Sequence, residues 1–168
     1  MFNSLIFCFL DYNKNYIVHL FFTHFMSLHE NFHSRVMAFG TFDLFHPGHQ
    51  YYISEAMKQA DECIVVVARD HRVVSWKGRT PVDDEEKRKQ NIEKHFPGIR
   101  VILWDEVDMM MPLRMYKPDI LAVWYDQKVP LDRVHEVLPE VSIIRIAGFE
   151  TDTWKSSKLR DIPPYRKE

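Results

Sequence analysis

Short apolar runs alternate with longer amphipathic stretches along the chain from Ser34 onward. The run at 63–68 reads Cys-Ile-Val-Val-Val-Ala, with no polar residue between the apolar ones. Continuous runs of this kind are typical of parallel strands that are buried on both faces. The apolar runs predict five strands, at 36–39, 63–68, 99–103, 120–123 and 141–147.

Between these runs, apolar residues recur every three or four positions, which is the spacing of one helical face. The segment 83–96 also carries end signals, because Asp83 can serve as its N-cap with Glu86 three residues later, and Pro97-Gly98 follows. Helices are predicted at 48–60, 83–96, 131–138 and 155–161. Strands separated by helices form right-handed βαβ units. The pattern therefore predicts an α/β fold with a Rossmann-like, doubly wound sheet of about five parallel strands.

Residues 1–33 differ from the rest and are treated as an N-terminal extension of uncertain status before a domain at 34–168. They hold nine of the chain's 23 aromatic residues but only three charged ones. Polar residues at 11–15 interrupt the apolar stretch, so we expect no membrane span. Three interpretations stay open: a docking or dimerisation arm (hence a possible homodimer), an interfacial membrane anchor, or residues upstream of the native start, with Met26 and Met37 as later starts. We favour the last, because so many exposed aromatic side chains would promote aggregation.

Composition and charge exclude several classes of protein. The 168-residue chain is 46% hydrophobic and 27% charged, and its net charge of −2 excludes a broadly basic nucleic-acid-binding protein. Cys8 and Cys63 are too few and too far apart for a disulfide framework or a zinc site, so we expect a cytoplasmic protein. Four histidines are spaced so that they do not share one helical face, and we predict no protein-held metal site from them; they are His19, His24, His29 and His33.

Residues 40–49 carry the strongest chemical signal. They read Gly-Thr-Phe-Asp-Leu-Phe-His-Pro-Gly-His and lie where the first predicted strand passes into the first predicted helix. A helix N-terminus offers unpaired N–H groups and the positive end of the helix dipole, so such a junction can bind phosphate. Lysine and arginine are the usual phosphate ligands. His46 and His49 therefore suggest groups that donate hydrogen bonds to charge developing during a reaction.

A group of cations follows the predicted strand at 63–68. Lys77 and Arg79 lie in the sequence Lys-Gly-Arg-Thr-Pro, and Arg88 lies on the next predicted helix. Arginine can donate to two phosphate oxygens at once, whereas lysine acts as a mobile point charge. These cations suggest an anionic ligand, with solvated surface charge as the alternative.

Two later strand ends hold polar side chains suited to a nucleotide. Asp126 follows the fourth predicted strand and could bind a base, a ribose or the shell of a Mg²⁺ ion, or simply belong to a turn. Ser156 and Ser157 open the last predicted helix. One serine could simply cap that helix, but two hydroxyls with nearby lysines would also form a second phosphate clamp facing His49. The three methionines at 109–111 could line an apolar acceptor pocket or fill the core.

The motif at 40–49 resembles the signature of the cytidylyltransferase-like nucleotidyltransferases, and the resemblance extends over nearly all of 35–160. In that family the two histidines contact the triphosphate and stabilise the transition state at the α-phosphate. The resemblance implies catalytic roles for His46, His49, Lys77 and Arg79, and acceptor binding by Lys77, Arg79 and Arg88. The nucleotide-binding residues of the motif are Gly40, Thr41, Phe42, Asp43 and Gly48. Asp126, Ser156 and Ser157 are added as nucleotide-binding residues from their positions at the later strand ends.

Within that family, the segments 65–70, 77–81 and 117–127 look most like those of archaeal-type FAD synthases, which transfer AMP from ATP to FMN and release pyrophosphate. The expected partners are therefore ATP, accompanied by Mg²⁺, and FMN. Glycerol-3-phosphate cytidylyltransferases share the first motif, but the stretch 148–157 lacks their arginine and their glycine-isoleucine pair. CTP with glycerol 3-phosphate stays an alternative, as does a catalytically inactive nucleotide-binding module. Trp124 stands where the FAD synthases usually have a glycine.

Overall fold

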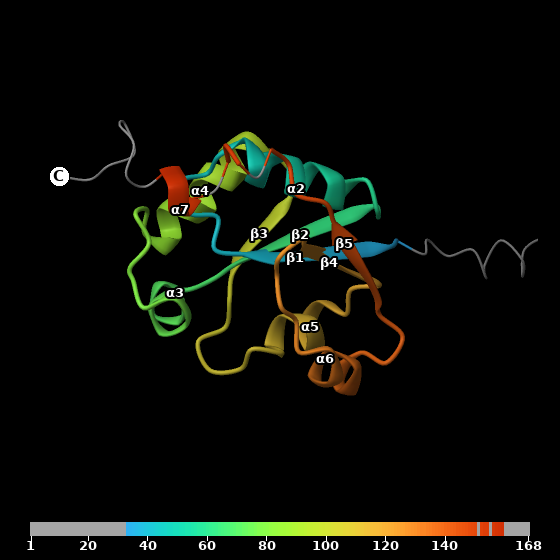
Figure 1. Cartoon of the computed structure of the whole chain (residues 1–168). Coiled ribbons are helices and arrows are strands. Elements are labelled where there is room, and N and C mark those ends of the chain that lie inside the picture. The colour runs from blue at the N-terminus through green and yellow to red at the C-terminus, as the bar shows by residue number, and fades with distance from the viewer. Residues whose placement is uncertain (1–32, 151, 155, 160–168) are drawn as a thin grey trace, which may run out of the picture. The chain divides into compact units, whose positions relative to one another are not determined.

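A computed structural model of the protein describes residues 33–150, 152–154 and 156–159 (Figure 1). The expectations for residues 1–32, including three of the four histidines named above, lie outside the described residues. So do the ends of the last predicted helix and the side chain of Ser157.

In the described part of the chain, five parallel strands form one sheet in the order β3-β2-β1-β4-β5. Every strand pair is parallel, with Met37 opposite Ile64 on one side of β1 and Leu121 on the other. The predicted doubly wound sheet is therefore confirmed. The strands are β1 (Arg35–Gly40), β2 (Glu62–Val67), β3 (Arg100–Leu103), β4 (Ile120–Trp124) and β5 (Ser142–Ile146).

Helices cover both faces of this sheet, with α2 and α4 on one face and α5 and α6 on the other (Figure 1). The helices are α2 (Pro47–Met57), α3 (Asp70–Lys77), α4 (Glu85–His95), α5 (Met111–Tyr116), α6 (Leu131–Val137) and α7 (Ser156–Leu159). None of the helices in the described part of the chain is long and apolar enough to cross a membrane.

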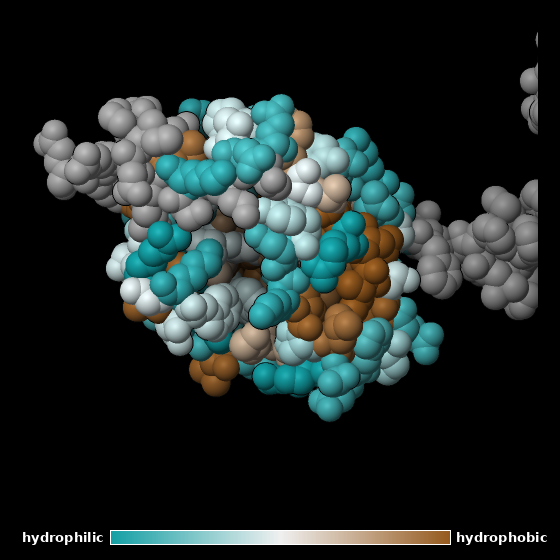
Figure 2. All heavy atoms as spheres, in the orientation of Figure 1, coloured by the Kyte–Doolittle hydropathy of each residue, from teal (hydrophilic) through white to brown (hydrophobic). Residues whose placement is uncertain are grey.

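The sheet separates two apolar cores. Along β1, Ala38 packs on one face with Ile53 of α2, and Met37 packs on the other face with Leu113 of α5. Burial on both faces explains why the strands read as continuous apolar runs. The surface in Figure 2 is mostly hydrophilic, with apolar atoms gathered beside the edge strand β5.

The start of α4 differs from the prediction by one residue. Asp84, not Asp83, is the N-cap, and its carboxylate accepts a hydrogen bond from the backbone N–H of Lys87. Asp83 instead joins tertiary contacts: its N–H donates to the carboxylate of Asp43 at 3.0 Å, and its carbonyl oxygen accepts from Nε of Arg88 at 3.1 Å. The first helical hydrogen bond runs from the Arg88 N–H to the carbonyl oxygen of Asp84.

Candidate active site

The loop after β1 turns sharply before α2. Phe42 and Leu44 have φ angles of 56° and 58°, a left-handed conformation that residues other than glycine rarely adopt. Both side chains are almost fully buried, so core packing compensates the strain. Gly40 must lack a side chain, because a Cβ there would lie 2.8 Å from the Phe42 ring. The loop is thereby held in the one conformation that brings residues 46–49 to the end of β1.

His46 and His49 stack on each other where α2 begins. Their ring centroids are 3.8 Å apart and their planes differ by 22°. Gly48 makes room for this stack, since a Cβ there would lie 3.1 Å from the His46 ring and 3.3 Å from the carbonyl oxygen of Trp154. The side chain of His46, the N-cap of α2, makes no capping hydrogen bond, and the first turn holds no acidic residue. Pro47 has no N–H, and the N–H groups of His49 and Gln50 donate to the carbonyl oxygen of His46. The first turn therefore leaves the backbone N–H of Gly48 for an anion.

Ser156 of α7 joins the C-terminal segment to the histidine pair. Its Oγ donates to the carbonyl oxygen of Asp43 at 2.8 Å and lies 3.2 Å from Nε2 of His46. Because the hydroxyl proton goes to Asp43, the Nε2 of His46 carries a proton and donates to Ser156. The Nδ1 atoms of His46 and His49 are buried with no hydrogen-bond partner among the described residues. Ser156 thus sets the tautomer of His46.

Burial keeps both imidazoles neutral. Desolvation lowers the pKa of His46 to about 4, against an opposing effect of the Asp43 carboxylate. Desolvation also lowers the pKa of His49 well below its usual range; a proton on His46 would lower it further, and so does the charge of Lys77. At neutral pH each ring therefore has one N–H to donate and carries no charge.

Acidification is expected to destabilise the fold through His46. Its pKa is about 6.5 in the unfolded chain and about 4 in the folded protein, so the unfolded chain binds more protons between these values. The stability contributed by the neutral ring is present above the unfolded pKa and is lost as the pH falls toward 4. The loss amounts to at most about 1.4 kcal/mol per pH unit. Urea unfolding across this range should show a shallower pH dependence for His46→Asn than for the wild type. Parallel curves would refute the lowered pKa.

Lys77 lies on the other side of the loop, at the end of α3. Gly78 follows it in the left-handed conformation, with φ of 66°, and ends the helix. The Nζ of Lys77 donates to Oγ1 of Thr41 at 3.0 Å, and both residues line the same cavity. Arg79 is exposed and lies outside the cavity wall. The structure therefore brings Lys77, but not Arg79, to the histidine pair.

Arg88 is fully buried and binds the protein itself, which corrects the expectation that it binds an acceptor. Its side chain has no exposed surface, so it cannot reach a ligand in the cavity. Every guanidinium nitrogen donates to the protein: to the carbonyl oxygens of Asp83, Thr41 and Ala68 and to the carboxylate of Asp70, over 2.5–3.1 Å. Arg88 is a positioning residue that ties the ends of β1 and β2 to α4.

Asp43 is likewise turned toward the protein. It is 3% exposed, and Oδ1 of its carboxylate accepts hydrogen bonds from the backbone N–H groups of Val82 and Asp83 at 2.9 and 3.0 Å. Its carbonyl oxygen accepts from Ser156. The expectation that the Asp43 side chain binds the nucleotide is corrected accordingly: Asp43 holds together three segments that surround the histidine pair.

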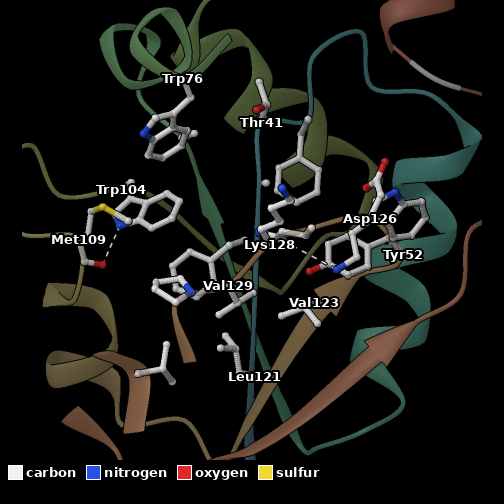
Figure 3. Close-up of a pocket in the computed structure, with 18 of the residues that line it drawn as sticks. Thr41, Tyr52, Trp76, Trp104, Met109, Leu121, Val123, Asp126, Lys128 and Val129 are labelled. Atoms are coloured by element: carbon white, nitrogen blue, oxygen red, sulfur yellow. Dashed lines mark hydrogen bonds between the residues drawn. The ribbon is translucent and has the colours of Figure 1, made fainter. Parts of the chain in front are cut away.

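A cavity of about 640 Å³ opens at the carboxyl ends of β1 and β4, where parallel sheets bind ligands (Figure 3). We call one side of it the polar half, formed by Thr41, His49, Lys77, Asp126, Gln127 and Ser156. The apolar half is formed by Phe39, Trp76, Trp104, Met109, Met110, Leu113, Leu121, Val123, Val129, Pro130 and Val134. Trp76 and Trp104 lie across the cavity from Tyr52 and Asp126 (Figure 3).

The loop after β4 is fixed from the edge strand. One nitrogen of the Arg145 guanidinium lies 2.8–3.2 Å from the carbonyl oxygens of Trp124, Tyr125 and Gln127. The Trp124 indole packs edge-on against Tyr52, with ring centroids 4.8 Å apart, and still lines the cavity. Trp124 therefore fills space that a glycine would leave open, while the loop that presents Asp126 is held in place.

The described residues contain no group of three or more His, Cys, Asp or Glu side chains that could hold a metal ion. Asp126 is a single exposed carboxylate in the polar half. Mg²⁺ needs only one or two protein carboxylates when phosphate oxygens and waters supply the other ligands. The residues present therefore fit a Mg²⁺ ion that arrives with a nucleoside triphosphate.

Some of the residues that build this site were not anticipated from sequence. Trp104 directly follows a predicted strand, and that position at the carboxyl end of a parallel strand was an available signal. Trp76 precedes Lys77 on a helix that was not predicted at all. Arg145 lies within a strand, and nothing in the local sequence indicates that its side chain reaches the loop after β4.

The comparisons with known proteins agree with this geometry. A family model described as cytidylyltransferase-like matches residues 37–162. An FAD synthase from Thermoplasma acidophilum is 37% identical over 130 residues, which are 75% of this chain and 91% of that protein. An FAD synthase from Archaeoglobus profundus is 39% identical over 127 residues, covering 73% of this chain and 81% of that protein.

A solved structure shares the fold closely. The crystal structure of a lipopolysaccharide core biosynthesis protein from Thermoplasma volcanium is 38% identical in sequence to this chain, with a TM-score of 0.62. The match covers 70% of this chain and 98% of that protein. The similarity therefore spans nearly the whole of that relative's chain.

Proposed function

The chain belongs to the cytidylyltransferase-like family, and from this premise we propose that it is an adenylyltransferase that transfers AMP from ATP to FMN, giving FAD and pyrophosphate. The observation that carries the proposal is the neutral, stacked pair of His46 and His49 at the N-terminus of α2, with Lys77 beside it. The similarity to FAD synthases supports ATP as the donor and FMN as the acceptor.

The reaction needs positioning more than acid–base chemistry. An oxygen of the FMN phosphate attacks the α-phosphorus of ATP, a new P–O bond forms, and the bond from the α-phosphorus to the bridging oxygen breaks to release pyrophosphate. A phosphate nucleophile is already ionised at neutral pH, so no general base is required. Catalysis then rests on alignment and on stabilising the charge that builds up on the phosphate oxygens.

The histidine pair is suited to that task. Neutral imidazole N–H groups and the backbone N–H of Gly48 in the first turn of α2 can donate to oxygens of the α- and β-phosphates as charge develops there. In the free protein the Nε2–H of His46 donates a hydrogen bond to Ser156. A bound phosphate oxygen would accept this hydrogen bond in place of Ser156, or share it with Ser156. Both rings are already oriented, so little reorganisation is needed at the moment of reaction.

Lys77 supplies a permanent positive charge, and Lys128 is a second lysine that lines the cavity. The Nζ of Lys77 is held by Thr41 in the polar half, where it can meet the leaving pyrophosphate or the acceptor phosphate. Arg79, exposed on the loop after α3, would reach only a phosphate at the mouth of the cavity. Asp126, which lines the cavity, would bind the nucleotide or a water of its Mg²⁺ ion. Mg²⁺, when bound, would neutralise part of the triphosphate charge.

Pyrophosphate release tests the proposed function. The purified protein would be assayed with ATP or CTP against FMN, glycerol 3-phosphate and other phosphorylated acceptors. We expect pyrophosphate with ATP and FMN only. Activity confined to CTP and glycerol 3-phosphate would favour the cytidylyltransferase alternative, and nucleotide binding without pyrophosphate from any pair would favour an inactive binding module. Either result overturns the proposal.

A further inference from the structure

We propose that the apolar half of the cavity binds the isoalloxazine ring of the flavin, with the Trp104 indole as its stacking partner. The inference rests on the proposed function in that the flavin is the acceptor FMN. The isoalloxazine ring takes no part in the transfer of AMP, so this part of the cavity would determine which acceptor binds and not how the phosphates react.

Trp104 is held rigidly with its hydrogen-bonding needs met. Its Nε1–H donates to the carbonyl oxygen of Met109 at 2.9 Å, and its own carbonyl oxygen accepts from Nε of Arg69 at 3.1 Å. Phe39 packs against the indole with ring centroids 4.7 Å apart, and Trp76 approaches it edge-on at 5.5 Å. An indole fixed in this way offers a preorganised apolar surface that loses little entropy when a ligand binds.

The walls of the apolar half match a large planar ring. Leu121 and Val123 of β4 form its floor, and Met109 faces the cavity beside Trp104 (Figure 3). Isoalloxazine is a flat tricyclic system with an apolar dimethylbenzene end, which gains from offset stacking on an indole and from contact with a thioether. Glycerol 3-phosphate, a small polar acceptor, would bury none of this surface.

The chain connects the apolar half directly to the phosphate-binding groups. Phe39 lies one residue before the turn that begins at Gly40, and Trp76 lies immediately before Lys77 on α3. A flavin ring at Trp104 would therefore direct its ribityl phosphate toward Thr41 and Lys77, where the α-phosphate of ATP is expected.

Adenine is better matched by the opposite side of the cavity. Its edges carry hydrogen-bond donors and acceptors, and the loop at 124–127 presents a side-chain carboxylate and backbone groups that Arg145 holds in position. The apolar half offers mainly Trp, Met, Leu and Val side chains. The two planar rings of the substrates thus go to two sides of the cavity, with the phosphates between them.

Flavin binding and steady-state kinetics test this assignment. Dissociation constants for FMN and for riboflavin would be measured by quenching of flavin fluorescence, and KM for FMN and for ATP by pyrophosphate release. Trp104→Ala is expected to weaken flavin binding by about 10- to 100-fold, with KM for ATP changed less than about twofold. Trp104→Phe should retain most of the affinity. Met109→Ala, in the apolar half, should weaken FMN binding, whereas Met115→Ala, at an exposed position of α5, should not.

The outcomes separate this inference from the function it rests on. If the wild type forms FAD but Trp104→Ala binds FMN and riboflavin as tightly as the wild type does, the site assignment is wrong and the proposed function stands. A loss of ATP affinity in Trp104→Ala, with flavin affinity kept, would place adenine in the apolar half and also overturn the assignment. If the wild type forms no FAD, the proposed function fails. The flavin dissociation constants, which need no turnover, then still decide the site.

Discussion

Replacing His49 with alanine is expected to lower kcat by about 10²- to 10³-fold, the cost of removing one donor to a charge-developing oxygen. The ring lies in the cavity at the start of α2 and is stacked on His46. Its Nδ1 makes no hydrogen bond to a described residue, so the substitution leaves no protein group unsatisfied. The fold should therefore survive, and the loss should appear in turnover.

The matched control for this prediction is His135→Ala. His135 is an exposed histidine on α6 and lines no part of the cavity. Steady-state pyrophosphate release and thermal unfolding would be measured for both variants. If His49→Ala has the kcat of the wild type, His49 does not contribute to catalysis. Equal losses in the two variants would mean that the effect is not local to the site.

Replacing Arg88 with alanine is expected to destabilise the protein by about 3–5 kcal/mol, the range for removing one partner of a buried ion pair. The buried guanidinium would leave behind a carboxylate and three carbonyl oxygens. The Asp70 carboxylate would lose its ion-pair partner, and carbonyl oxygens at the ends of β1 and β2 would lose their hydrogen-bond donor. These losses lower the free energy of unfolding, because water cannot reach all of these oxygens to replace the guanidinium. A typical domain has a total stability of about 5–15 kcal/mol, so the effect should be large.

Urea unfolding of three variants measures this effect. Arg88→Lys should be intermediate, since an ammonium keeps the charge but cannot reproduce the planar fork. Lys87→Ala, the neighbouring exposed cation on α4, should change the free energy of unfolding by less than about 0.5 kcal/mol. If Arg88→Ala unfolds cooperatively at the same urea midpoint as the wild type, Arg88 does not stabilise the loops after β1 and β2.

The strands were predictable because burial on both faces leaves a continuous apolar signature, as in Cys63–Ala68, most of which is β2. Helices α3 and α5 were not predicted. Helix α3 has eight residues and only Val73 buried, and α5 has six residues with a proline in its first turn. Short helices with few buried positions carry little periodicity, so their existence depends on tertiary contacts that sequence patterns do not encode.

The histidine motif was predictable, but the roles of the charged residues around it were not. In the sequence, Lys77 and Arg88 are both cations near one loop. In the structure, Lys77 lines the cavity, whereas the side chain of Arg88 is fully buried. What separates them is the set of backbone carbonyls that the fold gathers around Arg88, and that set exists only after β1, β2 and α4 have come together. The sequence likewise could not show that the Asp43 carboxylate binds the protein. The two backbone N–H groups that donate to it come from residues 39 and 40 positions further along the chain.

The fate of a labelled α-phosphate shows whether the protein transfers AMP from ATP to FMN. The protein would be incubated with FMN and ATP carrying a radioactive α-phosphate, and the flavin products would be separated and identified by mass. We expect the label to appear in FAD, in equal amount to the pyrophosphate released, and labelled CTP to give no flavin product. Label that never enters a flavin, or that passes only from CTP to glycerol 3-phosphate, would contradict it.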